Sequence, residues 1–395
     1  MAGHFQPVAV KFTKGSLIIV EGKPSANRFY IVKEGRVQIS HETEALTETS
    51  IVGPGEMFGV VSAMASRSYI ESAVALTEVT LFAVDRSLIS NSTPVAVNII
   101  RQFSQRLRKL NEAYSRRLMK NAASEDPSHL FQIGRYYEKI SKNNQALYAY
   151  QQYCAYCPDA PNIHSIKEKI KKMETKATVV RPEYSPDTMV QSYPKDCLLF
   201  AEGETGYNLY IIQEGAVKIT KIVDNQETIL AVLKKGDIFG EMAMLEDKPR
   251  AATAEIYEDC TLLAINRSNF TNLINDQPDM VIRLTTLMAE RIWFRSRQLT
   301  NTSIINPLGR IYDALLIQLE KYRVDLTSTG SYQFNFGFKE LVSMAGIPEA
   351  RAKELFNKVS SSGRITVKDN KVFITNIESA VNDAEYYRRG RKSDE

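Results

Sequence analysis

The chain has 395 residues, of which 44% are hydrophobic and 24% are charged, a balance typical of a globular protein with about two to four domains. A formal net charge of +4 is too small to indicate a nucleic-acid or membrane surface by itself, since neutralising phosphates requires a local basic patch. The sequence has no N-terminal leader pattern and no run of about 18 apolar residues, so we expect a cytoplasmic protein without a membrane segment.

Residues 8–90 predict a barrel of short antiparallel strands. Apolar positions alternate with polar ones between turns that contain glycine, as at Gly22 and Gly35. This pattern is typical of a jelly-roll-like barrel. Residues 95–118 then carry apolar side chains at steps of three and four, which predicts a long amphipathic helix. We therefore expect a first domain over residues 1–121.

Residues 122–176 are expected to form a helical linker. Several residues match the spacing of a tetratricopeptide helix pair: Gly134, Tyr137, Ala146, Tyr150 and Pro158. One such pair cannot bury its own apolar face, so it needs a partner, and we expect the flanking long helices to provide it. An ordinary helical linker is the alternative. In either case the segment is a spacer or a docking surface for a protein partner.

The linker contains Cys154 and Cys157, two of the four cysteines in the chain. Four scattered cysteines are too few for a disulfide framework in a chain of this length, which fits a reducing compartment. His164 follows the pair, but a second cysteine pair is missing, so a metal or redox site is the less favoured interpretation. We expect helix-packing cysteines and no metal.

The strand pattern of the first barrel returns in the second half of the chain. Residues 199–203 repeat the segment 17–22, and residues 209–219 repeat the segment 29–39. The chain therefore contains this domain twice, and we place the second copy over residues 177–303.

A glycine, an acidic residue and an arginine in the second copy predict an anion site. Gly240 lets the backbone approach a ligand closely, so that amides on the following helical turn can donate to a phosphate. Arg250 offers a planar fork of donors, and Pro249 fixes the backbone before it. Glu241 suits a ribose hydroxyl as an acceptor. Residues 239–256 are therefore expected to hold one sugar-phosphate.

This stretch resembles the phosphate-binding cassette of cyclic nucleotide-binding domains. The family's cassette reads Phe-Gly-Glu, then alanine with leucine or methionine, then Pro-Arg-Ala-Ala-Thr, and both polar anchors occur here at the same spacing. The resemblance implies a cyclic nucleotide held by these residues: Gly240, Glu241, Met242, Ala243, Arg250, Ala251 and Ala252. Alanines after the arginine go with cyclic AMP more often than with cyclic GMP, so we expect cyclic AMP. The alternative is that Glu241 and Arg250 pair across a loop of a barrel that binds nothing.

The first copy lacks both anchors. Laying the copies together puts Val60 where Glu241 stands and Tyr69 where Arg250 stands. A phosphate there would lose charge-assisted hydrogen bonds worth about 1.5 to 3 kcal/mol each. We predict that the first barrel does not bind cyclic AMP in the usual way and is a structural copy kept for dimer-like packing. A substitute role for Arg67, or a different ligand, is the alternative.

Residues 280–299 predict a second amphipathic helix after the second barrel. In the cyclic-AMP receptor protein family, which the chain resembles, the corresponding helix forms the dimer interface and contributes side chains over the base. The resemblance adds Trp293, Arg295 and Ser296 to the nucleotide site, with a tryptophan or arginine stacked on adenine. A core role for Trp293 is the alternative. The sequence leaves open whether the two barrels imitate a dimer or the chain forms a homodimer.

Residues 304–378 predict a winged helix-turn-helix. Residues 338–359 form helix, turn and helix with Gly346 at the turn, and residues 361–374 form two short strands that meet at Asp369 and Asn370. The order of barrel, long helix and winged helix, over about residues 190–376, resembles the cyclic-AMP receptor protein family and implies DNA binding.

The match weakens at the helix expected to read bases. The family's second helix usually begins with Arg-Glu and has another arginine four residues later, whereas Glu349, Ala350 and Glu354 occupy these positions. The cations available for DNA are on this helix and the wing: Arg351, Lys353, Lys358 and Lys368. Residues 379–395 form a basic tail that either contacts phosphates or is a solvated end.

The sequence thus predicts an α+β multidomain protein. It has two jelly-roll (double-stranded β-helix) cyclic nucleotide-binding barrels, long helices, a helical linker and a C-terminal winged helix-turn-helix. We expect a sensor that binds cyclic AMP in the second barrel only and regulates transcription by binding DNA. The alternative is a regulatory or scaffold protein whose winged helix docks a protein. No nucleophile–base arrangement or nucleotide-triphosphate loop occurs in the sequence, so we do not expect an enzyme.

Overall fold

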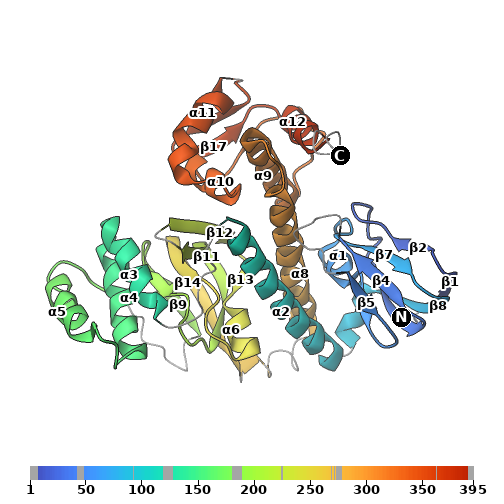
Figure 1. The fold of residues 1–395 in the computed structure, drawn as a ribbon, viewed down its shortest axis with the longest axis horizontal. Helices are drawn as coiled ribbons and strands as arrows, with labels where there is room; N and C mark the ends of the chain where they lie inside the picture. The colour runs from blue at the N-terminus through green and yellow to red at the C-terminus, as the bar shows by residue number, and fades with distance from the viewer. Residues whose placement is uncertain are drawn as a thin grey trace. The chain divides into compact units, whose positions relative to one another are not determined.

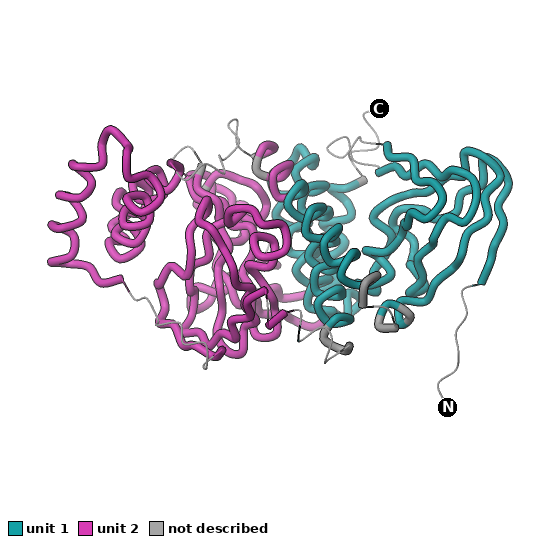
Figure 2. The backbone as a smooth tube through the Cα atoms, turned by 90° about the horizontal axis from the view of Figure 1, so that it is seen from below, with its two compact units in different colours: residues 1–110, 272–329, 377–395 teal, residues 111–271, 330–376 magenta. Residues whose placement is uncertain are grey.

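The chain folds into two compact units, each assembled from separate segments (Figure 2). The computed structural model describes these residues: 8–41, 49–91, 93–118, 128–179, 189–223, 226–267, 269–270, 272, 278–361 and 363–389. Unit 1 comprises residues 1–110, 272–329 and 377–395, and unit 2 comprises residues 111–271 and 330–376. Each unit contains one of the two repeated β-rich domains.

β-domain 1, in unit 1, consists of two four-stranded antiparallel sheets with the strand orders β1-β8-β3-β6 and β2-β7-β4-β5. Its core is apolar and includes the fully buried side chains of Val37 and Leu81. The strands are β1 (Val8–Phe12), β2 (Leu17–Ile19), β3 (Arg28–Glu34), β4 (Val37–Ser40), β5 (Ser50–Val52), β6 (Met57–Phe58), β7 (Ser72–Ala75) and β8 (Val79–Asp85).

The helices of unit 1 come from both halves of the chain. They are α1 (Val60–Ala65), the 3₁₀ helix Arg86–Asn91, α2 (Thr93–Leu118), whose last turns fall in unit 2, α8 (Pro278–Asn301), α9 (Pro307–Lys321) and α12 (Ile377–Arg389). α8 follows the second copy of the repeat in sequence, yet it packs beside α1 of the first copy (Figure 1). Helix α9 begins at Asn306, whose side chain accepts a hydrogen bond from the Leu308 amide at 2.9 Å.

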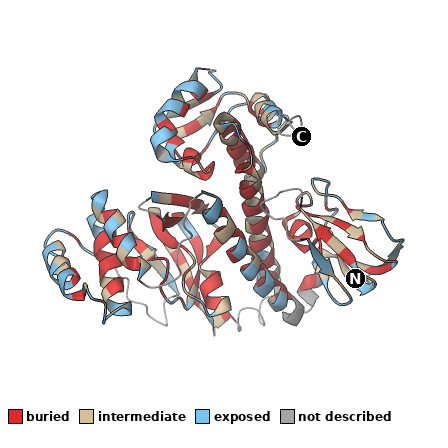
Figure 3. Ribbon diagram, viewed as in Figure 1, coloured by how far each residue is buried: buried red, intermediate tan, exposed pale blue. Residues whose placement is uncertain are grey.

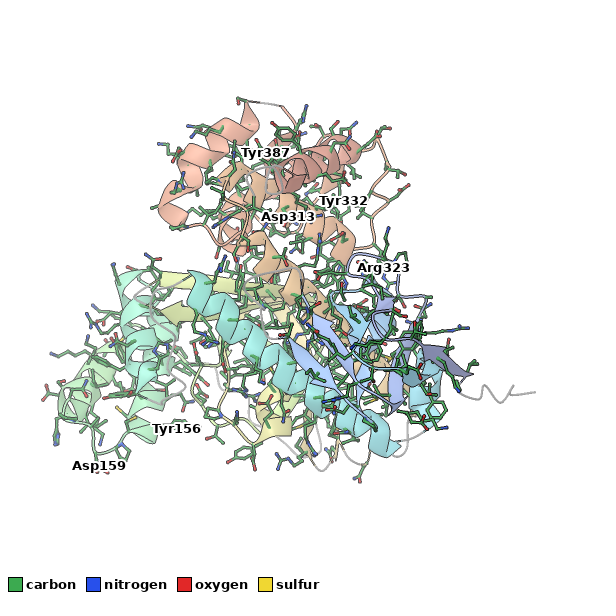
Figure 4. All side chains as sticks on the ribbon, turned by 45° about the vertical axis from the view of Figure 1, so that its right-hand side comes forward. Tyr156, Asp159, Asp313, Arg323, Tyr332 and Tyr387 are labelled. Atoms are coloured by element: carbon green, nitrogen blue, oxygen red, sulfur yellow. The ribbon has the colours of Figure 1, made fainter. Side chains whose placement is uncertain are left out.

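The C-terminal segment differs from the predicted basic tail. Residues 377–389 form α12, which packs on α9, and Asp313 of α9 and Tyr387 of α12 lie in this contact (Figure 4). Arg388 forms an ion pair with the buried Asp313, and Tyr387 stacks on Tyr312 with the ring centroids 6.2 Å apart. Arg388 therefore anchors the helix to its own unit. Residues 390–395 of the expected tail lie outside the described residues.

β-domain 2, in unit 2, is built around the long antiparallel pair β11 and β14, in one sheet of order β10-β14-β11-β12 with β13 on β11 and β9 on β14. Buried residues occur along this pair (Figure 3), and among them Val217 and Ile256 are fully buried. The elements are β9 (Val190–Tyr193), β10 (Leu198–Phe200), β11 (Asn208–Val223), β12 (Gln226–Lys234), β13 (Ile238–Phe239), α6 (Glu241–Glu246) and β14 (Thr253–Asn266).

A helical insert precedes β-domain 2 and consists of α3 (His129–Lys139), α4 (Asn143–Tyr156) and α5 (Ile163–Met173). One buried cluster joins Leu130 and Ile133 of the insert to Leu198 and Ile222 of β-domain 2. We expected the flanking long helices to cover the insert. The structure gives this role to β-domain 2, because the outer faces of β10 and β11 carry apolar side chains that complete the insert's core.

The C-terminal part of unit 2 contains helix, turn, helix and hairpin in the predicted order. It consists of β15 (Tyr332–Gln333), α10 (Phe338–Met344), the 3₁₀ turn Glu349–Arg351, α11 (Ala352–Ser360), β16 (Ile365–Lys368) and β17 (Lys371–Ile374), with strand order β15-β17-β16. Asp369 and Asn370 have positive φ angles of 48° and 57°, as a tight hairpin turn requires. Among the residues that the structure describes, no helix combines the length and apolar character of a membrane span.

Candidate functional site

The predicted anion site lies where β13 passes into α6. Gly240 caps α6 with φ +77°, a conformation that L side chains rarely adopt. A Cβ at this position would lie 2.7 Å from Nη1 of Arg250. Glycine is therefore needed here both for the backbone turn and for the close approach of the arginine.

Arg250 is buried, with only 4% of its surface exposed. Its Nη1 donates a 2.7 Å hydrogen bond to the Gly240 carbonyl, and its guanidinium lies 4.1 Å from the centroid of the Phe200 ring. In the part of the chain that the structure describes, its Nε has no hydrogen-bond partner. Burial lowers the pKa of Arg250, while nearby Tyr210 and Glu204 act in the opposite direction. A buried cation with an unused donor is an arrangement that a phosphate can satisfy.

The other predicted cassette residues surround this arginine in unit 2. Glu241, Met242 and Ala243 occupy the first turn of α6, and all three are buried. The Glu241 carboxylate is close enough to Arg250 to favour its charged form. Ala252 is buried and Ala251 is half-buried at the start of β14.

A second wall of the site comes from residues 201–206, which sequence reasoning did not single out. The Gly203 amide donates to the Arg250 carbonyl at 2.9 Å, and the Arg250 amide donates to the Glu204 carbonyl at 2.7 Å. A Cβ on Gly206 would lie 2.2 Å from the Arg250 Nε, so this position also requires glycine. The Glu-Gly pair that occurs in both copies was the sequence feature that could have pointed to this wall of the site.

The same backbone pair occurs in β-domain 1. The Gly22 amide donates to the Tyr69 carbonyl, and the Tyr69 amide donates to the Lys23 carbonyl, both at 2.8 Å. These bonds place Tyr69 at the position that Arg250 occupies in β-domain 2. The Tyr69 hydroxyl donates to the Ser25 carbonyl at 3.1 Å, inside the domain.

β-domain 1 contains its own anion at the corresponding turn. The buried Glu71 carboxylate accepts the Gly59 amide at 2.8 Å and the Arg106 Nη2 at 3.1 Å. Burial opposes ionisation of Glu71, but Arg106 and the Gly59 amide outweigh it and lower the pKa. Gly59 has φ +74°, like Gly240. The turn that would meet a ligand in this copy is thus occupied by an internal carboxylate.

The three predicted base contacts lie on α8 in unit 1, whereas Arg250 lies in unit 2. Trp293, Arg295 and Ser296 are all buried. The Trp293 Nε1 donates to the Ser68 carbonyl of β-domain 1 at 2.8 Å, and the Arg67 guanidinium lies 5.5 Å from its ring centroid. These contacts give Trp293 a packing role, and its role at a base stays a prediction.

The predicted DNA contacts are exposed on one part of unit 2. Arg351 lies in the 3₁₀ turn, Lys353 and Lys358 lie on α11, and Lys368 ends β16. The Glu354 carboxylate lies 2.7 Å from the Lys358 Nζ and 3.6 Å from the Arg351 Nε. The hydrogen bond from Lys358 and the charge of Arg351 lower the pKa of Glu354, so it is an anion among these cations.

The described ranges contain no group of three histidine, cysteine or acidic side chains that could hold a metal ion. Cys154 and Cys157 of the insert are free cysteines.

Comparison with known proteins gives matches to both copies of the repeat. The family model of the cyclic nucleotide-binding domain matches residues 9–91 and 190–277. The cAMP-activated global transcriptional regulator CRP of Pasteurella multocida is 31% identical over 159 residues, which are 40% of this chain and 76% of that protein. The cyclic AMP receptor protein of Thermus thermophilus is 29% identical over 172 residues, 43% of this chain and 76% of that protein.

Among the solved structures that match this chain is that of the c-di-GMP responsive global regulator CLP of Xanthomonas campestris. It is 20% identical, covers 47% of this chain and 93% of its own, and has a TM-score of 0.41.

Proposed function

Since the chain belongs to the cyclic-AMP receptor protein family, we propose that it is a cyclic-nucleotide sensor that regulates transcription. In this proposal cyclic AMP binds in β-domain 2, and residues 304–378 form a winged helix that binds DNA. Cyclic GMP is the less favoured ligand because Ala251 and Ala252 follow the arginine. The Pasteurella multocida relative is a transcriptional regulator, and the proposal assigns no catalysis to this chain.

The observation that carries the proposal is the state of Arg250. Its guanidinium is buried beside the Gly240 turn, one of its N–H groups is unused within the described residues, and Phe200 supports one of its faces. Such a group costs several kcal/mol to bury unless an anion compensates it. A cyclic phosphate brings a further negative charge to the guanidinium and suits the planar arrangement of its donors.

The proposal assigns the parts of the nucleotide to three sets of residues. Arg250 and the amides of the α6 turn bind the phosphate, and Glu241 accepts from the ribose hydroxyl. Met242, Ala243, Ala251 and Ala252 line the space next to them. Trp293, Arg295 and Ser296 of α8 are the proposed base contacts.

β-domain 1 is proposed to bind no cyclic nucleotide. Glu71 supplies an anion to the Gly59 amide, and Tyr69 replaces the arginine. A phosphate would have to displace a buried carboxylate that Arg106 also holds. Repulsion between the two anions opposes such binding.

Regulation then requires that cyclic AMP bind one conformation of the protein more tightly than another. A ligand with equal affinity for both conformations changes neither population. In this proposal the active conformation is the one in which α11 is available to DNA.

Isothermal titration calorimetry of the full chain with cyclic AMP and cyclic GMP tests the proposal. We expect one cyclic AMP per chain and weaker binding of cyclic GMP. Arg250→Ala should weaken cyclic AMP binding about 10- to 100-fold, since charge-assisted hydrogen bonds are worth about 1.5 to 3 kcal/mol.

Lys248→Ala is the matched control, because it removes an exposed positive charge two positions earlier in the same loop. It should leave the affinity within about twofold of wild type. Equal losses in both variants would show only a diffuse effect of charge. Two molecules of cyclic AMP per chain would contradict the assignment of a silent β-domain 1.

A further inference from the structure

Helix α4 of the insert holds the loop that encloses Arg250. The Tyr148 hydroxyl donates to a carboxylate oxygen of Glu204 at 3.1 Å, and the Tyr156 hydroxyl accepts the Thr205 amide at 3.0 Å. Tyr148 is 6% exposed, whereas Tyr156 lies at the exposed C-terminal end of α4 (Figure 4). Two side chains of the insert thus bind adjacent residues of one loop.

The same loop residues hold the cassette arginine. Glu204 is buried, its other carboxylate oxygen accepts the Ala201 amide at 2.9 Å, and its carbonyl accepts the Arg250 amide at 2.7 Å. The chain of hydrogen bonds therefore runs from the Tyr148 hydroxyl through Glu204 to the backbone amide of Arg250. Gly206, two residues further on, lies against the guanidinium itself.

Helix α4 also reaches the strand that follows the arginine. Lys142, at the N-terminus of α4, lies with its Nζ 2.5 Å from a carboxylate oxygen of Glu255 in β14, and the Gln145 amide donates to the same oxygen at 3.4 Å. Glu255 is 2% exposed. The insert therefore holds two segments next to Arg250: the loop that contains Glu204, which precedes the arginine in sequence, and the strand that contains Glu255, which follows it.

We propose that α4 of the insert sets the position of Arg250, and that Tyr148 is a positioning residue for the cyclic phosphate. The inference rests on the proposed binding of cyclic AMP in β-domain 2. A displaced guanidinium cannot align its donors with the phosphate, so binding energy depends on how firmly the loop holds it. By linkage, a nucleotide that engages Arg250 must also change the environment of Tyr148.

Calorimetry on the full chain with Tyr148→Phe tests this. The phenylalanine keeps the packing and removes the hydroxyl, so we expect cyclic AMP to bind about three- to tenfold more weakly. Tyr153→Phe is the matched control, since the Tyr153 hydroxyl on the same helix donates to Asn162 within the insert. It should bind cyclic AMP as tightly as wild type does.

A second measurement separates positioning from stability. With 3-fluorotyrosine at position 148, the fluorine resonance should move when cyclic AMP is added, and it should not move in Arg250→Ala. The same label at position 153 should give no shift. An unchanged resonance at 148, or equal affinities of the two phenylalanine variants, overturns the positioning role while cyclic AMP binding stands. A wild-type protein that binds no cyclic AMP overturns both proposals.

Discussion

Glu71 stands at the position in β-domain 1 that Ala252 occupies in β-domain 2. The registers agree, because Leu17 pairs with Val74 in the first copy and Leu198 pairs with Glu255 in the second. A methyl group in one copy is thus a buried carboxylate in the other. At the scale of the residue, this one exchange places a negative charge beside the Gly59 turn of β-domain 1.

The charge of Glu71 should stabilise the folded chain in a pH-dependent way. Its pKa is lowered from 4.5 on folding, so the stabilisation is present above that pH and is lost as the pH falls through the folded value. Glu71→Gln should lower the free energy of unfolding at pH 7 by about 1 kcal/mol. The value is kept small because Arg106 is partly exposed, and solvent weakens its attraction to the carboxylate. Urea denaturation at pH 7 and at about pH 4 measures the difference, which should shrink at the lower pH.

The control for this experiment is Glu78→Gln, which removes an exposed carboxylate from the same domain. Its free energy of unfolding should stay within about 0.5 kcal/mol of wild type at both pH values. A Glu71→Gln effect that grows as the pH falls would contradict the assignment of a charged carboxylate.

Two elements pack on a copy of the repeat other than the one that they follow in sequence. Helix α8 follows β-domain 2 but packs on α1 of β-domain 1, where Trp293 donates to Ser68. The helical insert follows β-domain 1 but completes its core with β-domain 2. Helix α8 therefore packs on the copy that is distant in sequence, whereas the insert packs on the copy that comes directly after it.

Close packing within the insert depends on Gly134. A Cβ there would lie 2.6 Å from the ring of Tyr150, which is fully buried and cannot move aside. Alanine favours a helix by about 1 kcal/mol over glycine, but overpacking costs about 1 to 3 kcal/mol. We expect Gly134→Ala to lower the free energy of unfolding by about 1 kcal/mol, measured by urea denaturation.

Gln132→Ala provides the comparison, because Gln132 is exposed on the same helix. Its free energy of unfolding should be equal to that of wild type or slightly higher, since alanine is a good helix former. A Gly134→Ala variant more stable than wild type would show that α3 and α4 can move apart without loss.

At the scale of the whole molecule, the proposed output depends on α11 and the turn before it, where exposed cations share the surface with Glu354. Lys358 and Arg351 both lie near its carboxylate. An anion at this position repels phosphates and weakens any contact with DNA. The protein-docking alternative would benefit from the same mixed charge.

Fluorescence anisotropy with a mixed-sequence DNA duplex of about 30 base pairs tests the output. We expect cyclic AMP to tighten DNA binding, and Lys353→Ala to reduce the slope of log affinity against log salt by about 1. Glu354→Gln should strengthen binding, whereas Lys358→Ala should have a smaller effect than Lys353→Ala because Lys358 is already paired. Absence of DNA binding with cyclic AMP present would favour a protein partner.

Local and repeated patterns were readable from the sequence. A repeated β-rich domain was predicted from strand alternation, glycine turns and an internal repeat. The resemblance of residues 239–256 to a phosphate-binding cassette implied a cyclic nucleotide-binding domain, and the family model confirms it in both copies. Gly240 and Arg250 were found because a positive φ and a phosphate-binding cation each demand a particular residue type. The helix, turn, helix and hairpin near the C-terminus were likewise predicted in order.

Contacts between distant segments were decided only by the tertiary structure. Glu71 and Arg106, Tyr148 and Glu204, and Arg388 and Asp313 are paired across long stretches of chain. No spacing rule links such residues, because their distance depends on how whole helices and sheets pack. The expected basic tail was wrong over residues 379–389 for this reason: charged residues near a chain end look solvated in sequence, and only the fold shows the buried Asp313 that pairs with Arg388.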